Sequence, residues 1–168
     1  MIRYLVRPCW LGSVLVAATD AGIVAVLLGS DPAALVRALH VRFPDAHPDT
    51  AGDDLADLAD ETIRVIEAPA RRFDRPLDLR GSDFERRVWS VLREIPAGQT
   101  LAYSEVAARL GVAAASREVA EACAANPVAV VVPCHRVVRK DGTLGGYRWG
   151  VARKRALLAR EAAAAGVS

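Results

Sequence analysis

A short apolar run, Val128–Val132, ends at a proline and is followed at once by a cysteine and a histidine. Five consecutive Val and Ala residues are typical of a strand buried on both faces. Pro133 has no N–H group to donate to a sheet, so the strand is predicted to stop there and the chain to turn. The run therefore predicts a core strand that presents Cys134 beside His135 at its end.

The Cys134-His135 pair is a candidate catalytic pair. A thiol becomes a good nucleophile only as the thiolate, and an adjacent imidazole is a common means of lowering the thiol pKa. An isolated Cys-His pair is nevertheless more often structural than catalytic. The pair alone leaves both interpretations open.

Length and composition describe a folded, soluble chain. Its 168 residues can form one compact domain or two small lobes, and 52% hydrophobic with 25% charged residues is typical of globular proteins. The apolar runs are far too short for a membrane span, and the N-terminus has no signal-peptide pattern. We expect a cytoplasmic protein with no membrane partner.

The cysteines argue against metal or disulfide chemistry. Cys9, Cys123 and Cys134 are an odd number without C-x-x-C spacing, so neither a disulfide framework nor a zinc site is predicted. Cys123 falls on a helix face suited to packing, where a free cysteine behaves as a small hydrophobic residue.

The charge of the chain is divided unevenly between its two halves. Residues 1–79 carry 8 basic and 12 acidic side chains, whereas residues 80–168 carry 14 basic and 8 acidic, giving −4 and +6. A basic half indicates nucleic acid as a partner. A solvated surface rich in arginine explains the same numbers equally well.

Residues 1–79 are predicted to form a scaffold of antiparallel sheet and helix. Leu11–Ala18 and Gly22–Leu28 are predicted strands joined by a hairpin turn, and Pro32 begins a helix with apolar residues at helical spacing. A second amphipathic helix is predicted over Asp53–Ile66. Nothing in this lobe suggests chemistry.

Residues 80–168 are predicted to be mainly helical. Ser82 and Glu85 form a capping box at the start of a helix. Ser104–Leu110 and Ser116–Ala125 are predicted helices joined through Gly111, the outline of a helix-turn-helix. A last helix is predicted over about 151–164.

The second lobe also carries several short motifs in a fixed order. These are Asn126-Pro127, Pro133-Cys134-His135-Arg136-Val137-Val138, Gly146-Tyr147-Arg148-Trp149-Gly150, and Arg153-Lys154 through Leu157-Leu158 to Glu161, preceded by Phe84–Trp89, Ile95-Pro96, Gly98, Tyr103 and Arg117. Together they resemble the O6-alkylguanine-DNA alkyltransferases. The resemblance is densest over about 82–161 and continues more loosely to Met1.

The resemblance implies an α+β fold. Its N-terminal lobe would be a ribonuclease H-like antiparallel sheet with helix, and its C-terminal lobe would contain a winged-helix-like helix-turn-helix. It also implies a methylated-DNA–protein-cysteine methyltransferase that acts as a monomer without a cofactor or metal. Such a protein binds double-stranded DNA in the minor groove, flips out an O6-alkylguanine and takes its alkyl group once.

The resemblance assigns the reacting residues by position. Cys134 would accept the alkyl group irreversibly, His135 would deprotonate it through a water molecule, and Glu161 would orient His135. Tyr103 would contact the flipped guanine and its phosphate, and a phenol could also donate a proton to the departing base. Asn126 would brace the turns around the site.

The resemblance also assigns DNA and substrate contacts. Arg117 would fill the gap left in the base stack, and arginine suits this place because its planar cation stacks on bases and pairs with phosphates. Backbone carbonyls near Cys134 and Val137 would read the guanine edge. The other expected contacts are Ser116, Arg136, Tyr147, Arg148 and Trp149.

Three positions depart from the usual family pattern. Glu118 follows Arg117 where small neutral residues are common, and it would oppose DNA phosphates unless it points aside or pairs with an arginine. Ala102 stands where a serine could cap the following helix. Trp149, beside the pocket, is expected to restrict bulky alkyl groups.

Other functions remain to be compared with repair. A lesion-binding protein of the alkyltransferase-like type lacks the acceptor cysteine, so Cys134 argues against it. A transcriptional regulator of this family would need a zinc-bound cysteine cluster, and a Cys-His hydrolase would turn over repeatedly.

Overall fold

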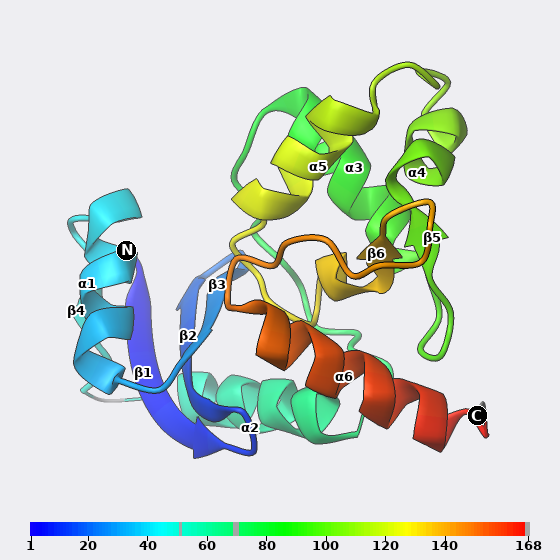
Figure 1. Ribbon diagram of the computed structural model, residues 1–168. Coiled ribbons are helices and arrows are strands. Elements are labelled where there is room, and N and C mark those ends of the chain that lie inside the picture. Colours follow the sequence, from blue (N-terminus) through cyan, green and yellow to red (C-terminus); the bar gives the residue numbers. More distant parts are fainter. Residues whose placement is uncertain (51, 69–70, 167–168) are drawn as a thin grey trace. The chain divides into compact units, whose positions relative to one another are not determined.

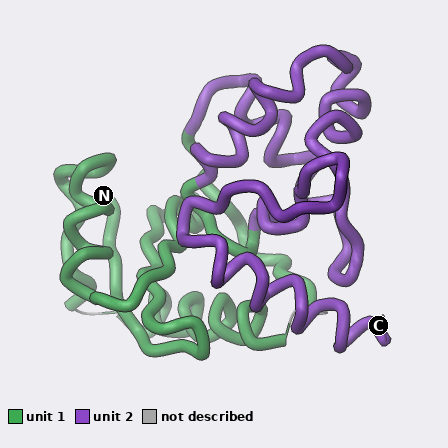
Figure 2. Tube along the Cα trace, viewed as in Figure 1, with its two compact units in different colours: residues 1–80, 127–131 green, residues 81–126, 132–168 purple. Residues whose placement is uncertain are grey.

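The computed structural model describes residues 1–50, 52–68 and 71–166. The chain divides into two compact units (Figure 2), one of Met1–Arg80 with Pro127–Val131 and the other of Gly81–Asn126 with Val132–Ser168. The division differs from the predicted boundary between residues 79 and 80 mainly in the segment 127–131, which joins the first unit.

The first unit is built on a four-stranded sheet (Figure 1). The strands β1 (Arg3–Cys9), β2 (Gly12–Thr19), β3 (Gly22–Gly29) and β4 (His47–Pro48) lie in the order β3-β2-β1-β4. The predicted hairpin between β2 and β3 is confirmed, with Thr19 paired to Gly22. β4 pairs parallel with β1, so the expectation of a purely antiparallel sheet is wrong. A helix precedes β4 in the chain, and this longer connection allows β4 to run in the same direction as β1.

Two helices pack on this sheet. Helix α1 (Pro32–Arg42) begins at Asp31, whose carboxylate accepts a hydrogen bond from the Ala33 N–H at 3.1 Å, and it packs on β2 and β3. Helix α2 (Asp53–Glu67) packs on β1 and β2 with its acidic residues directed outward. Both helices lie where the apolar spacing predicted them.

The segment Val128–Val132 is not a strand. Val128 forms a single bridge to Val26 of β3, and the backbone then turns, with the Val131 N–H 2.7 Å from the Ala129 carbonyl oxygen and a φ of 67° at Val130. All five residues are buried. A short apolar run reports burial reliably, but it does not distinguish a strand from a buried turn.

The second unit is mainly helical, as predicted. Its helices are α3 (Asp83–Arg93), α4 (Tyr103–Arg109), α5 (Ser116–Ala125) and α6 (Val151–Ala164). The capping box at α3 is confirmed, because Ser82 Oγ accepts from the Glu85 N–H and Glu85 Oε1 accepts from the Ser82 N–H. α3, α4 and α5 pack together, and the fully buried Trp89 of α3 donates a hydrogen bond from Nε1 to the Ala122 carbonyl oxygen of α5; the sequence did not identify Trp89 as a core residue. In the parts of the chain that the structure describes, no helix is long and apolar enough to cross a membrane.

A two-stranded sheet brings distant parts of the second unit together. Strand β5 (Leu101–Ala102) pairs parallel with β6 (Val137–Val138), so the start of α4 lies beside the segment that follows Cys134. Ala102 gives α4 no side-chain cap, as its identity requires. Glu105 Oε1 instead accepts a hydrogen bond from the Ala102 N–H at 2.9 Å.

Candidate functional site

The Cys-His pair lies on a single turn of 3₁₀ helix, η1 (Cys134–Arg136). Pro133 precedes this turn, its carbonyl oxygen accepts a hydrogen bond from the Arg136 N–H, and the Cys134 N–H donates to the Val132 carbonyl. Cys134 and His135 are both buried. The chain therefore turns at Pro133 as predicted, but into a helical turn that leads to β6.

Asn126 braces this turn from the end of α5. Its side chain is fully buried, and Nδ2 donates to the Val132 carbonyl oxygen at 2.9 Å. The Asn126 side chain also forms a hydrogen bond with the Cys134 thiol, which lowers the pKa of that thiol. One amide thus fixes both the turn and the sulfur atom.

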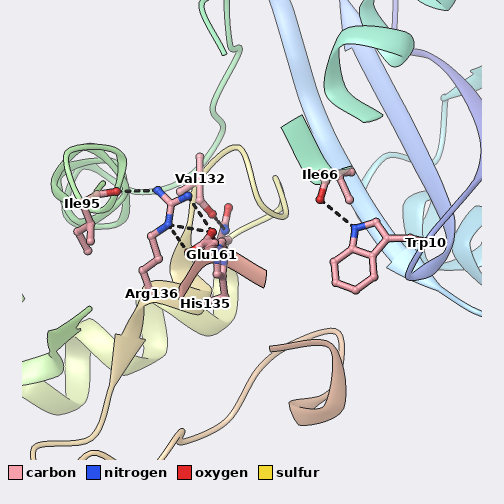
Figure 3. A network of polar contacts seen from close by, with 8 residues as sticks. Trp10, Ile66, Ile95, Val132, His135, Arg136 and Glu161 are labelled. Atoms are coloured by element: carbon pink, nitrogen blue, oxygen red, sulfur yellow. Dashed lines mark hydrogen bonds and ion pairs between the residues drawn. The ribbon is translucent and has the colours of Figure 1, made fainter. Parts of the chain in front are cut away.

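A buried ion pair and hydrogen bond hold the imidazole of His135 (Figure 3). His135 Nε2 lies 2.6 Å from Glu161 Oε1, and Arg136 Nε and Nη2 donate to the same carboxylate at 2.8–3.1 Å. Arg136 Nη1 also donates to the Ile95 carbonyl oxygen. Three nitrogen atoms of two side chains therefore contact one carboxylate, on a residue that is 1% exposed.

These contacts determine which ring nitrogen of His135 carries the proton. Burial alone would raise the pKa of Glu161, but hydrogen bonds from His135 and Arg136 lower it below the ordinary value. An ionised carboxylate only accepts hydrogen bonds, so Nε2 must carry the proton. Burial lowers the pKa of His135, more than Glu161 raises it. The ring is thus neutral near pH 7, with the Nδ1 lone pair available as a base.

Cys134 is protonated at rest. Burial raises the pKa of its thiol to about 11, although the Asn126 hydrogen bond and the charges of Lys154 and Arg148 act in the opposite direction. The expectation that an adjacent imidazole lowers this pKa is not met, because His135 is neutral and bonded to Glu161. Ionisation of Cys134 therefore requires that a base remove the proton.

Cys134 opens onto a cavity of about 330 Å³ within the second unit. The cavity is lined by Tyr103, Ala120, Cys123, Ala124, Cys134, Gly146, Tyr147 and Arg148. Three of these residues are small and lie on one face of α5. Cys123, expected to be a packing residue, is thus also part of the cavity wall, because its helix face borders the cavity.

Tyr147 and Trp149 stand in different relations to the cavity. Tyr147 lines it directly, whereas Trp149 is buried, packs edge-on against Tyr147 with ring centroids 5.3 Å apart, and lies outside the lining. Trp149 therefore supports the cavity wall through Tyr147, and the restriction of bulky alkyl groups stays a prediction. Burial raises the pKa of Tyr103 to about 12, so its phenol remains protonated.

Lys154 is a site residue that the sequence did not reveal. It lies on α6 and is fully buried, with Nζ 2.7 Å from the Val137 carbonyl oxygen and 3.2 Å from that of Gly146. Its ammonium also lies 6.0 Å from the centre of the Tyr103 ring. The sequence places Lys154 in the Arg153-Lys154 motif but gives it no role, because nothing in the spacing of α6 distinguishes a buried lysine from its more exposed basic neighbours.

Two expected DNA or substrate contacts also have partners within the protein. The Arg136 guanidinium is bonded to Glu161 and Ile95 with its side chain only 11% exposed, so we expect it to hold the site together and not to bind DNA. The Val137 carbonyl already accepts from Lys154, which leaves it one lone pair for a ligand. Burial beside η1 explains both differences.

Other expected contacts lie at the surface of α5. Arg117 is 88% exposed and lies 3.7 Å from Glu121, while Ser116 is the first residue of the helix. Glu118 is exposed. None of these residues lines the cavity. Among the residues with described positions, no three His, Cys, Asp or Glu side chains are grouped so that they could hold a metal ion.

Comparison with known proteins gives consistent matches. Residues 83–163 match the family model of the 6-O-methylguanine DNA methyltransferase DNA-binding domain. A methylated-DNA–protein-cysteine methyltransferase of Salmonella typhimurium is 42% identical over 120 residues, which is 71% of this chain and 67% of that protein. The crystal structure of Mycobacterium tuberculosis OGT in complex with DNA has a TM-score of 0.78 and 33% identity, covering 97% of this chain and 93% of that one.

A longer relative matches almost the whole chain. The bifunctional transcriptional activator/DNA repair enzyme Ada of Escherichia coli is 48% identical over 165 residues, or 96% of this chain. These residues are only 46% of Ada. The chain thus spans about half the length of this relative.

Proposed function

The chain belongs to the O6-alkylguanine-DNA alkyltransferase family, and we propose that it repairs DNA by moving an alkyl group from guanine O6 to Cys134 Sγ. The observation that carries this proposal is the position of Cys134. It lines a cavity of about 330 Å³, and the neighbouring His135 has its Nε2–H bonded to Glu161 and its Nδ1 available as a base.

Activation of the thiol is the first step. With a pKa of about 11, only on the order of one Cys134 in ten thousand is ionised at neutral pH. His135 Nδ1 takes the proton, through a water molecule, and becomes an imidazolium whose charge is stabilised by the Glu161 carboxylate. Lys154 and Arg148 lower the pKa of Cys134 and so favour the thiolate.

Transfer then exchanges one bond for another. The Cys134 thiolate attacks the alkyl carbon, a carbon–sulfur bond forms, and the carbon–O6 bond breaks with its electron pair moving to guanine. Tyr103, which lines the cavity and holds its phenolic proton, donates that proton to the departing base. The product is a thioether, so each molecule reacts once.

DNA reaches the cavity only after a base leaves the stack. A guanine inside a duplex cannot contact Cys134, so the protein flips it from the minor groove at a cost of a few kcal/mol. Arg117 is exposed on α5 and suits the gap left behind. The net charge of +6 over residues 80–168 favours the phosphate backbone. The protein acts as a monomer in this proposal.

Intact-mass measurement after incubation with O6-methylguanine duplex DNA tests the proposal. We expect a mass increase of one CH₂ group in the wild type and in Cys9→Ser, and none in Cys134→Ser. Peptide mapping should place the group on Cys134, although Cys123 lines the same cavity, because burial raises the Cys123 pKa well above its ordinary value. A methyl group on Cys123 or Cys9 would contradict the assignment.

The same experiment separates the alternative functions. A lesion-binding protein would retain the DNA without any change in its mass. A hydrolase would repair several equivalents of DNA per protein molecule. Repair that stops after one equivalent, together with the adduct, supports the transferase.

A further inference from the structure

Two buried polar atoms in the second unit lack hydrogen-bond partners. Among the described residues, the Tyr147 hydroxyl and His135 Nδ1 are the buried side-chain nitrogen or oxygen atoms for which no partner is present. The other buried polar side chains of the site, Asn126, Lys154 and Glu161, all form hydrogen bonds. Buried polar groups in proteins are nearly always paired, so two unpaired atoms at a reacting site point to a ligand or a water molecule.

The two atoms belong to neighbouring rings held in fixed positions. The Tyr147 and His135 rings are nearly perpendicular, at 79°, with centroids 6.4 Å apart. Trp149 packs on the Tyr147 ring, and Glu161 holds His135 Nε2. Tyr147 also lines the cavity onto which Cys134 opens.

Their hydrogen-bonding roles are complementary. Burial raises the pKa of Tyr147 well above its ordinary value, so its hydroxyl stays protonated and can donate. His135 Nδ1 must accept, because Nε2 carries the ring proton. One water molecule can accept a hydrogen bond from the Tyr147 hydroxyl and donate one to His135 Nδ1. The two side chains then need no direct contact with each other.

We propose that Tyr147 is a positioning residue for the proton transfer, and that its hydroxyl and His135 Nδ1 together hold the water that links Cys134 to His135. As the Cys134 S–H bond breaks, this water takes the thiol proton and passes one of its own to Nδ1. The thiol becomes a thiolate, the imidazole becomes an imidazolium, and the water is regenerated. Tyr147 keeps its proton throughout. This inference rests on the proposed function and adds a residue to its first step.

Several charged or titratable groups surround the water site and will contribute to any pH dependence. Those that act on Tyr147 or His135 are Cys134, Arg136, Arg153, Lys154 and Glu161. A useful variant must leave all of them in place. Tyr147→Phe does so, because it removes one oxygen and keeps the ring that packs on Trp149 and His135.

The rate at which iodoacetamide alkylates Cys134, followed by peptide mass mapping across a range of pH, tests the role without DNA. Tyr147→Phe should slow this reaction at neutral pH by about tenfold, a modest part of what general-base catalysis supplies. The ratio of the wild-type rate to the Tyr147→Phe rate should approach one as the pH rises toward the Cys134 pKa of about 11, because ionisation of the thiol then needs no base. A merely structural role would not produce this pH dependence.

Single-turnover methyl transfer from duplex DNA gives the second readout. Tyr147→Phe should lose rate in the same pH-dependent manner when the rate is measured at saturating DNA, so that the loss does not reflect a change in DNA affinity. Tyr103→Phe is the matched control. Loss of the proposed proton donor should slow methyl transfer from DNA without slowing the alkylation of Cys134 by iodoacetamide. Equal rates for Tyr147→Phe and wild type, or a loss that is constant across pH, would overturn the inference. Failure of the wild type to accept methyl would instead overturn the proposed function, and the iodoacetamide result would still test Tyr147.

Discussion

The ammonium of Lys154 lies 2.7 Å from the Val137 carbonyl oxygen, with no exposure to solvent. Burial lowers the pKa of Lys154, while the nearby thiols of Cys134 and Cys123 raise it. The reciprocal effect of Lys154 is to lower the pKa of Cys134. A buried cation bonded to carbonyl groups is thus placed where the nucleophile must acquire negative charge.

Replacement of this cation should make the thiol less reactive. In Lys154→Met we expect the pKa of Cys134 to rise further, and iodoacetamide alkylation at neutral pH to slow by about tenfold for each pKa unit. Lys140→Met is the matched control, because Lys140 is the other lysine of the chain and is exposed. A folded Lys154→Met protein with wild-type reactivity would show that the ammonium serves only to join Val137 and Gly146.

The raised pKa of Cys134 also predicts how stability depends on pH. The thiol is ionised above pH 9.0 in the unfolded chain but only near 11 in the folded one, so the folded state is favoured below 9 and loses this advantage as the pH rises. The loss from Cys134 alone should be about 1 kcal/mol between about pH 8 and about pH 10. Urea unfolding should show a smaller loss in Cys134→Ala than in wild type or Cys9→Ala. Parallel losses in all three would contradict the assigned pKa.

Arg136 should contribute to stability and not to DNA affinity. Removing it leaves the buried Glu161 carboxylate with one partner fewer, and breaking a buried ion pair typically costs about 3 kcal/mol. Arg136→Met should therefore lower the free energy of unfolding by roughly this amount, whereas Arg139→Met, at an exposed position, should have little effect. An Arg136→Met protein of normal stability with weakened DNA binding would instead support the DNA contact that the sequence predicts for Arg136.

Arg117 should show the opposite pattern. Its side chain is 88% exposed, so Arg117→Ala should change stability by no more than about 0.5 kcal/mol. It should slow repair of O6-methylguanine in duplex DNA more than reaction with the free base, since only the duplex needs its stack filled. Because both rate constants are measured on the same variant, a difference in the active fraction of the protein does not affect their comparison. Equal losses on both substrates would give Arg117 another role.

Local sequence signals predicted the helices of the second unit well. The bounds of α5, Ser116–Ala125, and of α6, Val151–Ala164, are confirmed to the residue, and Gly111 adopts the positive φ that ends α4. These signals are local, because spacing, capping and glycine conformation act within a few residues. The strands were harder to predict. β1 was missed because it alternates weakly, and β4 is two residues long.

The sequence predicted the site residues that belong to a recognisable motif. It did not predict the partners of residues whose environment is set by burial in the folded chain. Cys134, His135 and Asn126 are brought together within one short segment, and Glu161 reaches them from α6. Lys154 belongs to the same helix but carries no local mark of burial. Its environment depends on carbonyl groups at Val137 and Gly146, which only the folded chain places beside it. The ion pair of Arg136, an expected DNA contact, with Glu161 has the same non-local cause.

The last prediction concerns the charge that follows Arg117 on α5. Glu118 is exposed, and the partner that the structure gives Arg117 is Glu121, so Glu118 does not neutralise that arginine. If α5 approaches DNA, the Glu118 carboxylate opposes the phosphate field in a salt-dependent way. Glu118→Ala should therefore tighten binding to duplex DNA, most at low ionic strength, and leave the iodoacetamide reactivity of Cys134 unchanged. Glu121→Ala is the matched comparison, because it removes one negative charge from α5 as Glu118→Ala does but, unlike Glu118→Ala, frees Arg117. Titrations at two salt concentrations that show no gain for a folded Glu118→Ala protein would mean that this face of α5 points away from DNA.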